Sequence, residues 1–298
     1  MKCLRPSRLF ERVTHRLFEW VTHGRLGAWL LVALALSIGA VAAAQRRRGG
    51  EGDFPGEQVD RGGVPEWDVD PEFKDDVFTF ARIKYTSAGR GGWYGGWSWR
   101  VDYPDSDLNF SYRLHELTAL EVDPKGKVLE LTDDELFDYP FIYLVEPGRG
   151  MWLDDAEVAA LRRYLLNGGF LMVDDFWGEF EWSVFNEQIE RIFPDRKPVE
   201  LPLDHEIFHC VYDLKMKPQV PSIQTWYGGY TSERPDAQEP HYRAIFDDKK
   251  RIMVIICHNT DLGDGWEREG EDPNYFKEMS EKWAYPLGIN ILTYAMTH

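Results

Sequence analysis

The sequence predicts an α/β fold with a largely parallel sheet and helices on both faces. Short, continuous apolar runs occur at 141–145 (FIYLV), 170–173 (FLMV) and 251–257 (RIMVIIC), as is typical of strands that are covered on both sides. Segments with helical apolar spacing alternate with these runs. Strands that alternate with helices indicate an α/β domain rather than separate α and β regions.

Each element has a local signal. Residues 77–85 alternate like a strand, residues 89–104 form a Gly- and Trp-rich loop, and residues 107–120 carry apolar side chains at helical spacing. After 141–145, Asp154 and Glu157 predict a capped helix start, and Gly168-Gly169 predicts its end. Residues 182–193 predict another amphipathic helix, and 275–295 predict a final helix that is interrupted at Pro286.

The chain is acidic, and its charge is unevenly distributed. Among 298 residues, 34 Lys and Arg face 51 Asp and Glu, a formal net charge of -17. Residues 1–48 hold nine of the basic residues and only two acidic ones, so the remainder carries a net charge of -24. Because such a surface repels phosphate backbones, we predict no nucleic-acid partner.

The N-terminus has the features of an export signal. Basic residues precede an apolar run at 26–44, which ends with Ala42 and Ala44 at A-x-A spacing. Residues 1–44 are therefore predicted to be a signal peptide, or alternatively an uncleaved anchor through 26–44. Both place the rest of the chain outside the cytoplasm, in the periplasm or on the outer face of the inner membrane, with membrane contact only through this segment.

The remaining chain divides into a linker and one domain. Residues 45–76 are rich in Gly, Pro and acidic residues and predict a flexible linker, and residues 77–298 predict the folded domain. Cys210 and Cys257 lie in apolar stretches of this domain. A disulfide between them and two free thiols are both open alternatives.

Polar residues and Trp follow the predicted strands. In open parallel sheets ligands bind beyond the carboxyl ends of the strands, so these residues are the candidate crevice. Successive residues point to opposite sides, so only one of Asp174 and Asp175 is expected to face it. Capping of turns and helices is the alternative role for each acid. The candidates are Asp102, Glu146, Asp174, Asp175, Trp177, His258, Asn259, Asp261, Asp264, Trp266 and Glu267.

Several long motifs resemble a known family. Residues 165–182 (LLNGGFLMVDDFWGEFEW), 258–270 (HNTDLGDGWEREG), 285–298 (YPLGINILTYAMTH) and 102–110 (DYPDSDLNF) are similar to signatures of the bacterial "domain of unknown function 4159" family. The resemblance covers about residues 77–298. It implies a class I glutamine amidotransferase-like fold with a flavodoxin-like sheet, and no established activity.

The resemblance also implies where an amidotransferase nucleophile would stand. In amidotransferases of this fold the Cys lies on the tight turn after a strand, which here is Asp174-Asp175-Phe176. This turn holds no Cys, Ser or Thr, so glutamine hydrolysis is not predicted. Cys257 and His258 are neighbours on a strand, point to opposite faces and do not form a catalytic pair.

A zinc-protease motif occurs in an unsuitable context. His205 to His209 reads HExxH, which binds zinc only on a helix. Pro202 and Pro218 flank the segment, and residues 209–214 alternate like a strand, where the two His would lie roughly 13 Å apart. A loop entering a strand is predicted, with no zinc site.

Hard cations and carboxylate catalysis are the other chemistries considered. Asn259, Asp261, Asp264 and Glu267 offer oxygen ligands in one Gly-containing loop, although their spacing is not that of an EF-hand. A divalent cation is therefore an open possibility, with Asp261 and Asp264 as its ligands, and no other cofactor is predicted. Paired acids beside Trp93, Trp97, Trp177 and Trp266 also suit binding or hydrolysis of a glycan.

The preferred interpretation is an exported, non-catalytic binding or assembly module of the cell envelope, with envelope proteins or glycans as partners. The alternative is a carboxylate-dependent hydrolase of envelope glycan or peptide, assisted by a metal ion or not.

Overall fold

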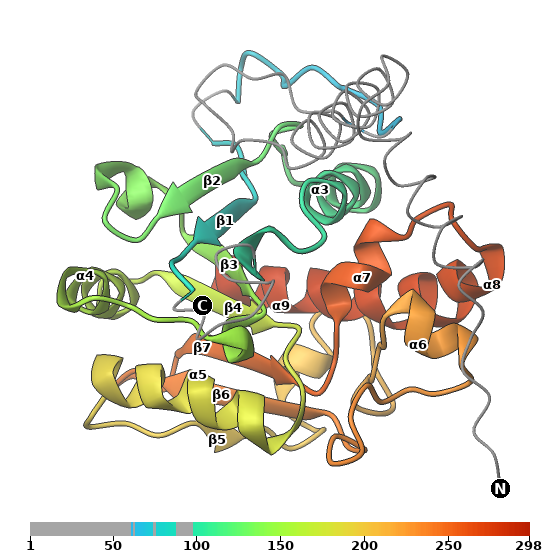
Figure 1. Ribbon diagram of the computed structural model, residues 1–298. Helices are drawn as coiled ribbons and strands as arrows, with labels where there is room; N and C mark the ends of the chain where they lie inside the picture. Colours follow the sequence, from blue (N-terminus) through green and yellow to red (C-terminus); the bar gives the residue numbers. More distant parts are fainter. Residues whose placement is uncertain (1–60, 62, 74–75, 88–97) are drawn as a thin grey trace, which may run out of the picture. The chain divides into compact units, whose positions relative to one another are not determined.

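The computed structural model describes residues 61, 63–73, 76–87 and 98–298 (Figure 1). The predicted signal or anchor at 1–44, most of the linker, and Trp93 and Trp97 lie outside the described residues. None of the helices within the described ranges combines the length and apolar character that crossing a bilayer requires.

A seven-stranded sheet forms the centre of the domain, in the order β2-β1-β3-β4-β7-β6-β5. The first five of these strands are parallel, and β6 and β5 add an antiparallel edge. The prediction of an α/β fold with a mostly parallel sheet is therefore confirmed. The strands are β1 (Ala81–Lys84), β2 (Lys127–Glu130), β3 (Phe141–Val145), β4 (Phe170–Asp174), β5 (Val199–Glu200), β6 (His241–Phe246) and β7 (Ile252–His258).

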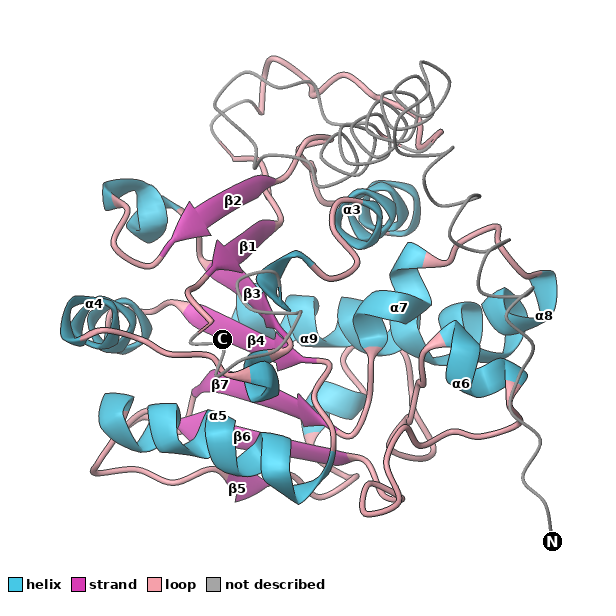
Figure 2. Cartoon of the chain, in the orientation of Figure 1, coloured by secondary structure: helices cyan, strands magenta, loops and turns pink. Residues whose placement is uncertain are grey.

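Helices cover both faces of this sheet (Figure 2). The longer helices are α3 (Asp105–Leu117), α4 (Asp155–Leu166), α5 (Gly178–Ile192) and α9 (Tyr285–Thr297), and the short ones are α6 (Ile223–Tyr227), α7 (Leu262–Glu267) and α8 (Pro273–Tyr275). One core packs α4 and α5 on the sheet, and the other packs α3, α7 and α9 on its opposite face. Alternate residues of β3 and β4 point into the two cores, which explains their continuous apolar sequences.

The start and the end of α4 have the features that the sequence predicts. The Asp154 carboxylate accepts hydrogen bonds from the backbone N–H groups of Ala156 and Glu157, both at 2.8 Å, and the Glu157 carboxylate accepts one from the Asp154 N–H at 2.7 Å. This is a complete capping box. At the other end Gly168 has φ 111°, a left-handed conformation that ends the helix before β4.

Other segments differ from the predictions. Residues 209–214 form no strand; a three-residue 3-10 helix, Glu206–Phe208, precedes an irregular segment. The last helix is not broken at Pro286. A π-helix, Phe276–Ala284, passes directly into α9, where Pro286 stands in the first turn and needs no backbone N–H. Cys210 and Cys257 are both free thiols, one exposed and one buried.

Candidate functional site

A cavity of about 330 Å³ lies beyond the carboxyl ends of the parallel strands. Its walls come from the segments after β1, β3, β4 and β7, and from residues 222–233 around α6. Acidic side chains predominate in a space that two Arg also line. The lining residues are Ser98, Val101, Asp102, Glu146, Arg149, Asp175, Ser222, Gln224, Glu233, Asp261, Asp264 and Arg268.

The backbone takes an unusual conformation at these segments. Asp102, Glu146, Asp175 and Asn259 have φ values of 63°, 50°, 53° and 62°, in the left-handed region that disfavours residues with a side chain. Glu146, Asp175 and Asn259 directly follow β3, β4 and β7, and Asp102 directly precedes the turn into α3. Such strain persists only where surrounding contacts fix it, and it is concentrated at functional sites.

Buried Arg82 fixes the segment that carries Asp102. In β1, its Nε donates to both carboxylate oxygens of Asp107 in α3, at 2.9 and 3.1 Å. Its Nη1 donates to the carbonyls of Trp99 and Val101, both at 3.0 Å. The Arg82–Asp107 pair therefore joins β1 to α3 and orders the residues immediately before Asp102.

Asp175 stands at the turn from β4 into α5 and is 6% exposed. Its Oδ1 accepts a hydrogen bond from Nε1 of Trp177 at 3.0 Å. Burial raises the pKa of Asp175 well above its usual range, and the neighbouring carboxylates of Glu146 and Asp102 raise it further. Trp177 is thus a buried support for Asp175 and not an exposed stacking surface.

Asp261 immediately precedes α7 and Asp264 lies in its first turn, after β7. Asp261 Oδ1 accepts from the backbone N–H of Asp264 at 2.7 Å and caps the helix. Asp264 Oδ2 accepts from the Ile223 N–H at 2.7 Å and from the Tyr275 hydroxyl at 3.1 Å. Burial followed by neighbouring carboxylates raises the pKa of Asp261 well above its usual range.

Glu146 and Glu267 each lie beside an Arg. Arg149 Nε is 2.9 Å from Glu146 Oε1, and Arg268 Nε is 2.8 Å from Glu267 Oε2 and 3.3 Å from Asp264 Oδ1. Burial is the main reason that the pKa of Glu146 and that of Glu267 rise to about 7, although the Arg lower them. Glu267 lies beside the cavity without lining it.

Two groups of three carboxylates share Asp102. In the first, Asp102, Asp175 and Asp261 each place an oxygen within 4.8 Å of the others, and in the second, Asp102, Asp264 and Glu267 do the same. We call the first the inner triad. Burial, followed by the carboxylates of Glu267 and Asp264, raises the pKa of Asp102 well above its usual range. Both groups consist of oxygen donors that suit a hard cation.

Asp174 lies outside the cavity lining, in contact with the start of α7. Its Oδ2 accepts from the hydroxyl of Tyr143 at 3.0 Å and from the N–H groups of Leu262 and Gly263 at 2.9 and 3.0 Å. Burial raises the pKa of Asp174 to about 7. Of the two consecutive acids, the structure thus places Asp175 at the cavity and Asp174 under α7.

The remaining candidates also lie outside the lining. His258 Nδ1 accepts from Arg243 Nη1 at 3.0 Å, and its Nε2 donates to the Gly178 carbonyl at 3.1 Å, consistent with a pKa that burial lowers to about 4. Asn259 joins Gly178 to Glu239 through its side-chain amide. Trp266 is 0% exposed and packs on aromatic side chains in the core.

Sequence reasoning missed part of the lining. Arg149 lies only three residues after Glu146 and could have been included on that ground. Residues 222–233, which supply Ser222, Gln224 and Glu233, carry no strand-end signal, because they reach the cavity from a connection that has only one short helix.

The HExxH segment forms no zinc site within the described residues. The Nδ1 of His209 is 2.7 Å from Asp213 Oδ1 and its Nε2 is 2.8 Å from the Leu203 carbonyl, so acceptors occupy both ring nitrogens. His205 Nδ1 accepts from the Ile207 N–H at 3.2 Å. The absence of a long helix explains this arrangement.

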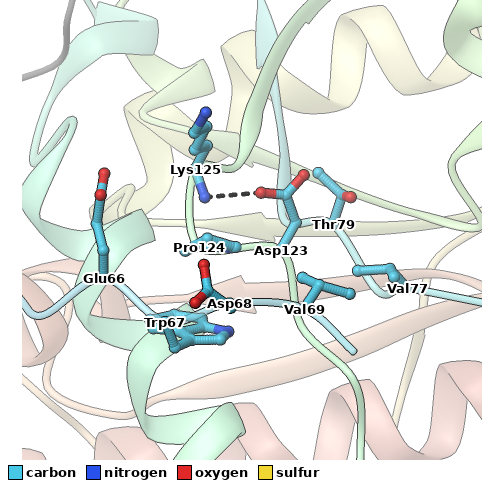
Figure 3. Close-up of a pocket in the computed structure, with 9 residues that line it drawn as sticks. All are labelled: Glu66, Trp67, Asp68, Val69, Val77, Thr79, Asp123, Pro124 and Lys125. Carbon is cyan, nitrogen blue, oxygen red and sulfur yellow. Dashed lines mark hydrogen bonds between the residues drawn. The ribbon is translucent and has the colours of Figure 1, made fainter. Parts of the chain in front are cut away.

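A larger hollow, about 630 Å³, lies at the amino ends of β1 and β2 (Figure 3). Glu66, Trp67, Asp123 and Lys125 are among its lining residues. The Lys125 N–H donates to Asp123 Oδ1 at 2.8 Å, and Trp67 Nε1 donates to the Val122 carbonyl at 2.8 Å. These contacts hold turns together, and the hollow contains no convergent set of acids like that of the strand-end cavity.

Comparison with known proteins gives a family without an assigned activity. A search of curated proteins finds no match to this chain. Residues 79–296 match the family described as "Domain of unknown function (DUF4159)". This match covers most of the chain and includes every residue that lines the strand-end cavity. The chain therefore belongs to the DUF4159 family.

Proposed function

We propose that this protein is a binding module of the cell envelope whose ligand carries positive charge and occupies the strand-end cavity. The observation that carries the proposal is the excess of buried carboxylates over bases there. Six acids line the cavity and two Arg face them. An isolated buried carboxylate is strongly disfavoured, so a cationic ligand would stabilise the ionised cavity.

The fold supports binding rather than amidotransferase chemistry. The parallel strands follow the order β2-β1-β3-β4-β7, which is the strand order of flavodoxin-like sheets, and we infer an amidotransferase-like relationship from it. Asp175, at φ 53°, occupies the tight strand-to-helix turn where a nucleophile would stand. A carboxyl group with a raised pKa is a poor substitute for a thiolate there.

A ligand panel tests the binding proposal. Purified protein is titrated with Ca²⁺, Mg²⁺, Mn²⁺, putrescine and arginine amide at pH 8, with calorimetry and thermal unfolding as readouts. At least one cation should bind and raise the melting temperature, and Asp175→Asn should weaken that binding. Glu187→Gln, an exposed change on α5, is the control of equal charge. If no cation binds, the proposal fails.

Export is the second part of the proposal, and it is supported by the basic segment, apolar run and Ala42-x-Ala44 pattern of the N-terminus. Envelope proteins or glycans are the proposed partners. Cell fractionation with sequencing of the mature N-terminus distinguishes a cleaved signal from an anchor. A cytoplasmic product that begins at Met1 would contradict export.

A carboxylate-dependent hydrolase is the second candidate function. The observation in its favour is that Glu146, with a pKa of about 7, lines the same cavity as Asp175. A carboxyl group with this pKa suits general acid catalysis near neutral pH. Release of fragments from envelope glycan or peptide, abolished by Glu146→Gln, would favour this candidate. Binding of such material without turnover would favour the module.

A further inference from the structure

We propose that the inner triad, Asp102, Asp175 and Asp261, is the binding site of one hard divalent metal ion. This inference rests on the proposed function and makes it specific, because it names the ligand class and the three side chains that hold it.

The positions of the Arg side chains favour the inner triad as the metal site. Three acids around it have an Arg partner: Arg149 lies beside Glu146, and Arg268 beside Asp264 and Glu267. Glu233, which also lines the cavity, accepts a hydrogen bond from the Ser222 N–H at 2.8 Å. Among the described residues, no Lys, Arg or His comes within 4.0 Å of the carboxylates of Asp102, Asp175 or Asp261. In the second group of acids, Arg268 therefore already pairs with Asp264 and Glu267, whereas no basic side chain pairs with the inner triad.

Asp102 supplies an independent indication of a ligand. Its Oδ2 atom is buried and accepts no hydrogen bond. Asp174 Oδ1 and Glu267 Oε2 also accept none, but Asp174 accepts three hydrogen bonds at its other oxygen and Glu267 Oε2 lies 2.8 Å from Arg268 Nε. Asp264 is bonded through both oxygens. A buried polar atom without a partner is rare in proteins and calls for a bound group. One carboxylate oxygen of Asp102 lies within 4.8 Å of an oxygen of Asp175 and of an oxygen of Asp261, so the Asp102 side chain points toward these two acids.

The local backbone leaves room for this arrangement. A Cβ at Gly263 would stand 2.5 Å from Asp102 Oδ2 and 3.5 Å from Asp261 Oδ1. Only Gly at this position lets the Asp102 carboxylate approach α7 so closely. Asp175 is oriented by its bond from Trp177, and it has its second oxygen free of any donor among the described residues.

The donors define the class of ion. All three are carboxylates, without His or Cys, which selects Ca²⁺, Mg²⁺ or Mn²⁺ over Zn²⁺ or Cu²⁺. Ions bound at about 2.1 to 2.5 Å accept ligand oxygens up to roughly 4 to 5 Å apart, which is the separation found here. Ser98, Gln224 and Glu233 line the same cavity, and together with water they would complete the coordination sphere.

Calorimetric titration of the metal-free full chain with Ca²⁺, Mg²⁺ and Mn²⁺ tests the site. We expect one ion per chain, with affinity reduced about tenfold or more in Asp102→Asn and Asp175→Asn, because each removes a charged ligand. Asn tolerates the left-handed backbone at both positions, and the two variants check one another if one fails to fold. Glu187→Gln on α5 is the control of equal charge: it removes a carboxylate from an exposed position outside the cavity lining, and should leave affinity within about threefold.

The outcomes separate the two proposals. Binding of putrescine or arginine amide without any metal binding overturns the metal site and leaves the cationic-ligand proposal standing. Binding of nothing overturns both. Metal binding that is equally weakened by Glu187→Gln, or unchanged in both Asn variants, shows that the inner triad does not hold the ion.

Discussion

Asp174 and Asp175 are consecutive acids with different surroundings, and they should respond differently to substitution. Asp174→Asn disturbs three hydrogen bonds that hold Tyr143 and α7, and should lower the free energy of unfolding by about 1 to 3 kcal/mol. Asp175→Asn removes a charge that neighbouring carboxylates repel, so stability at pH 8 should be kept or increased while cation binding is lost.

Urea unfolding and calorimetric titration of both variants check this expectation. Equal destabilisation of the two variants, with cation binding unchanged in both, would mean that Asp175 is structural and that the cavity is not the site.

Gly263 should be as important for the site as the acids. Gly263→Ala places a methyl group against Asp102 Oδ2 and the Tyr143 hydroxyl, so it should displace Asp102, weaken cation binding and cost about 1 to 3 kcal/mol. Gly265→Ala, also in α7, is the control. Its methyl group would meet Ala284 and Val220, so it should destabilise without reducing the affinity of the folded protein. Titration well below the melting temperature of both variants, where both are folded, measures affinity separately from stability.

At the scale of elements, the start of α4 offers a defined test. Asp154→Ala removes an acceptor of two backbone hydrogen bonds and should destabilise the protein by about 1 kcal/mol. Asp155 is next to it and fully exposed, and its side chain is bonded only to Arg191 at 3.0 Å, so Asp155→Ala should change stability less. Urea denaturation measures both. A larger effect from Asp155→Ala would contradict the role of the capping box.

The predictability of the elements follows from how much of their signal is local. Four elements were recognisable from the sequence, because a few adjacent residues suffice to indicate burial on both faces or a helix cap. They are the strands β3, β4 and β7 and the helix α4. β2 is only four residues, half of them charged, and β6 is an antiparallel strand with Arg243 in its middle, so neither has a continuous apolar run. Residues 209–214 alternate, but Asn290 of α9 bonds to the backbone of Val211 and Tyr212 and replaces a strand partner.

The candidate site was predictable only in part for a related reason. Strand ends identify which residues reach that edge of the sheet, and Asp102, Glu146, Asp175, Asp261 and Asp264 do line the cavity. Sequence does not tell which of two adjacent side chains turns inward, so Asp174 and His258 could not be separated from them. That distinction depends on the packing of α5 and α7.

At the scale of the whole molecule, the buried acids should make stability depend on pH. The pKa values of Glu146, Asp174 and Glu267 are about 7 in the folded protein, above the usual value of about 4 for an unfolded carboxyl. The folded state therefore binds more protons between pH 4 and 7, and stability is lost as pH rises through this range. His258, with a pKa of about 4, acts in the opposite sense but is a single group.

Thermal unfolding in EDTA should accordingly show a melting temperature higher at pH 5.5 than at pH 8, by on the order of 5 °C. Divalent cation at pH 8 should recover much of the difference. A melting temperature that is highest at pH 8 without metal would contradict the raised pKa values of these acids.

The cavity is assembled from parts of the chain between Ser98 and Arg268, and this sequence separation has a kinetic consequence. Asp102 and Asp261 meet only after β7 and α7 have docked on the sheet, so the acids remain hydrated and apart until late in folding. A cation that binds the inner triad then stabilises the native state and not the transition state. Calcium should therefore slow unfolding while leaving the refolding rate unchanged, so that the metal prolongs the lifetime of the finished domain without helping to build it.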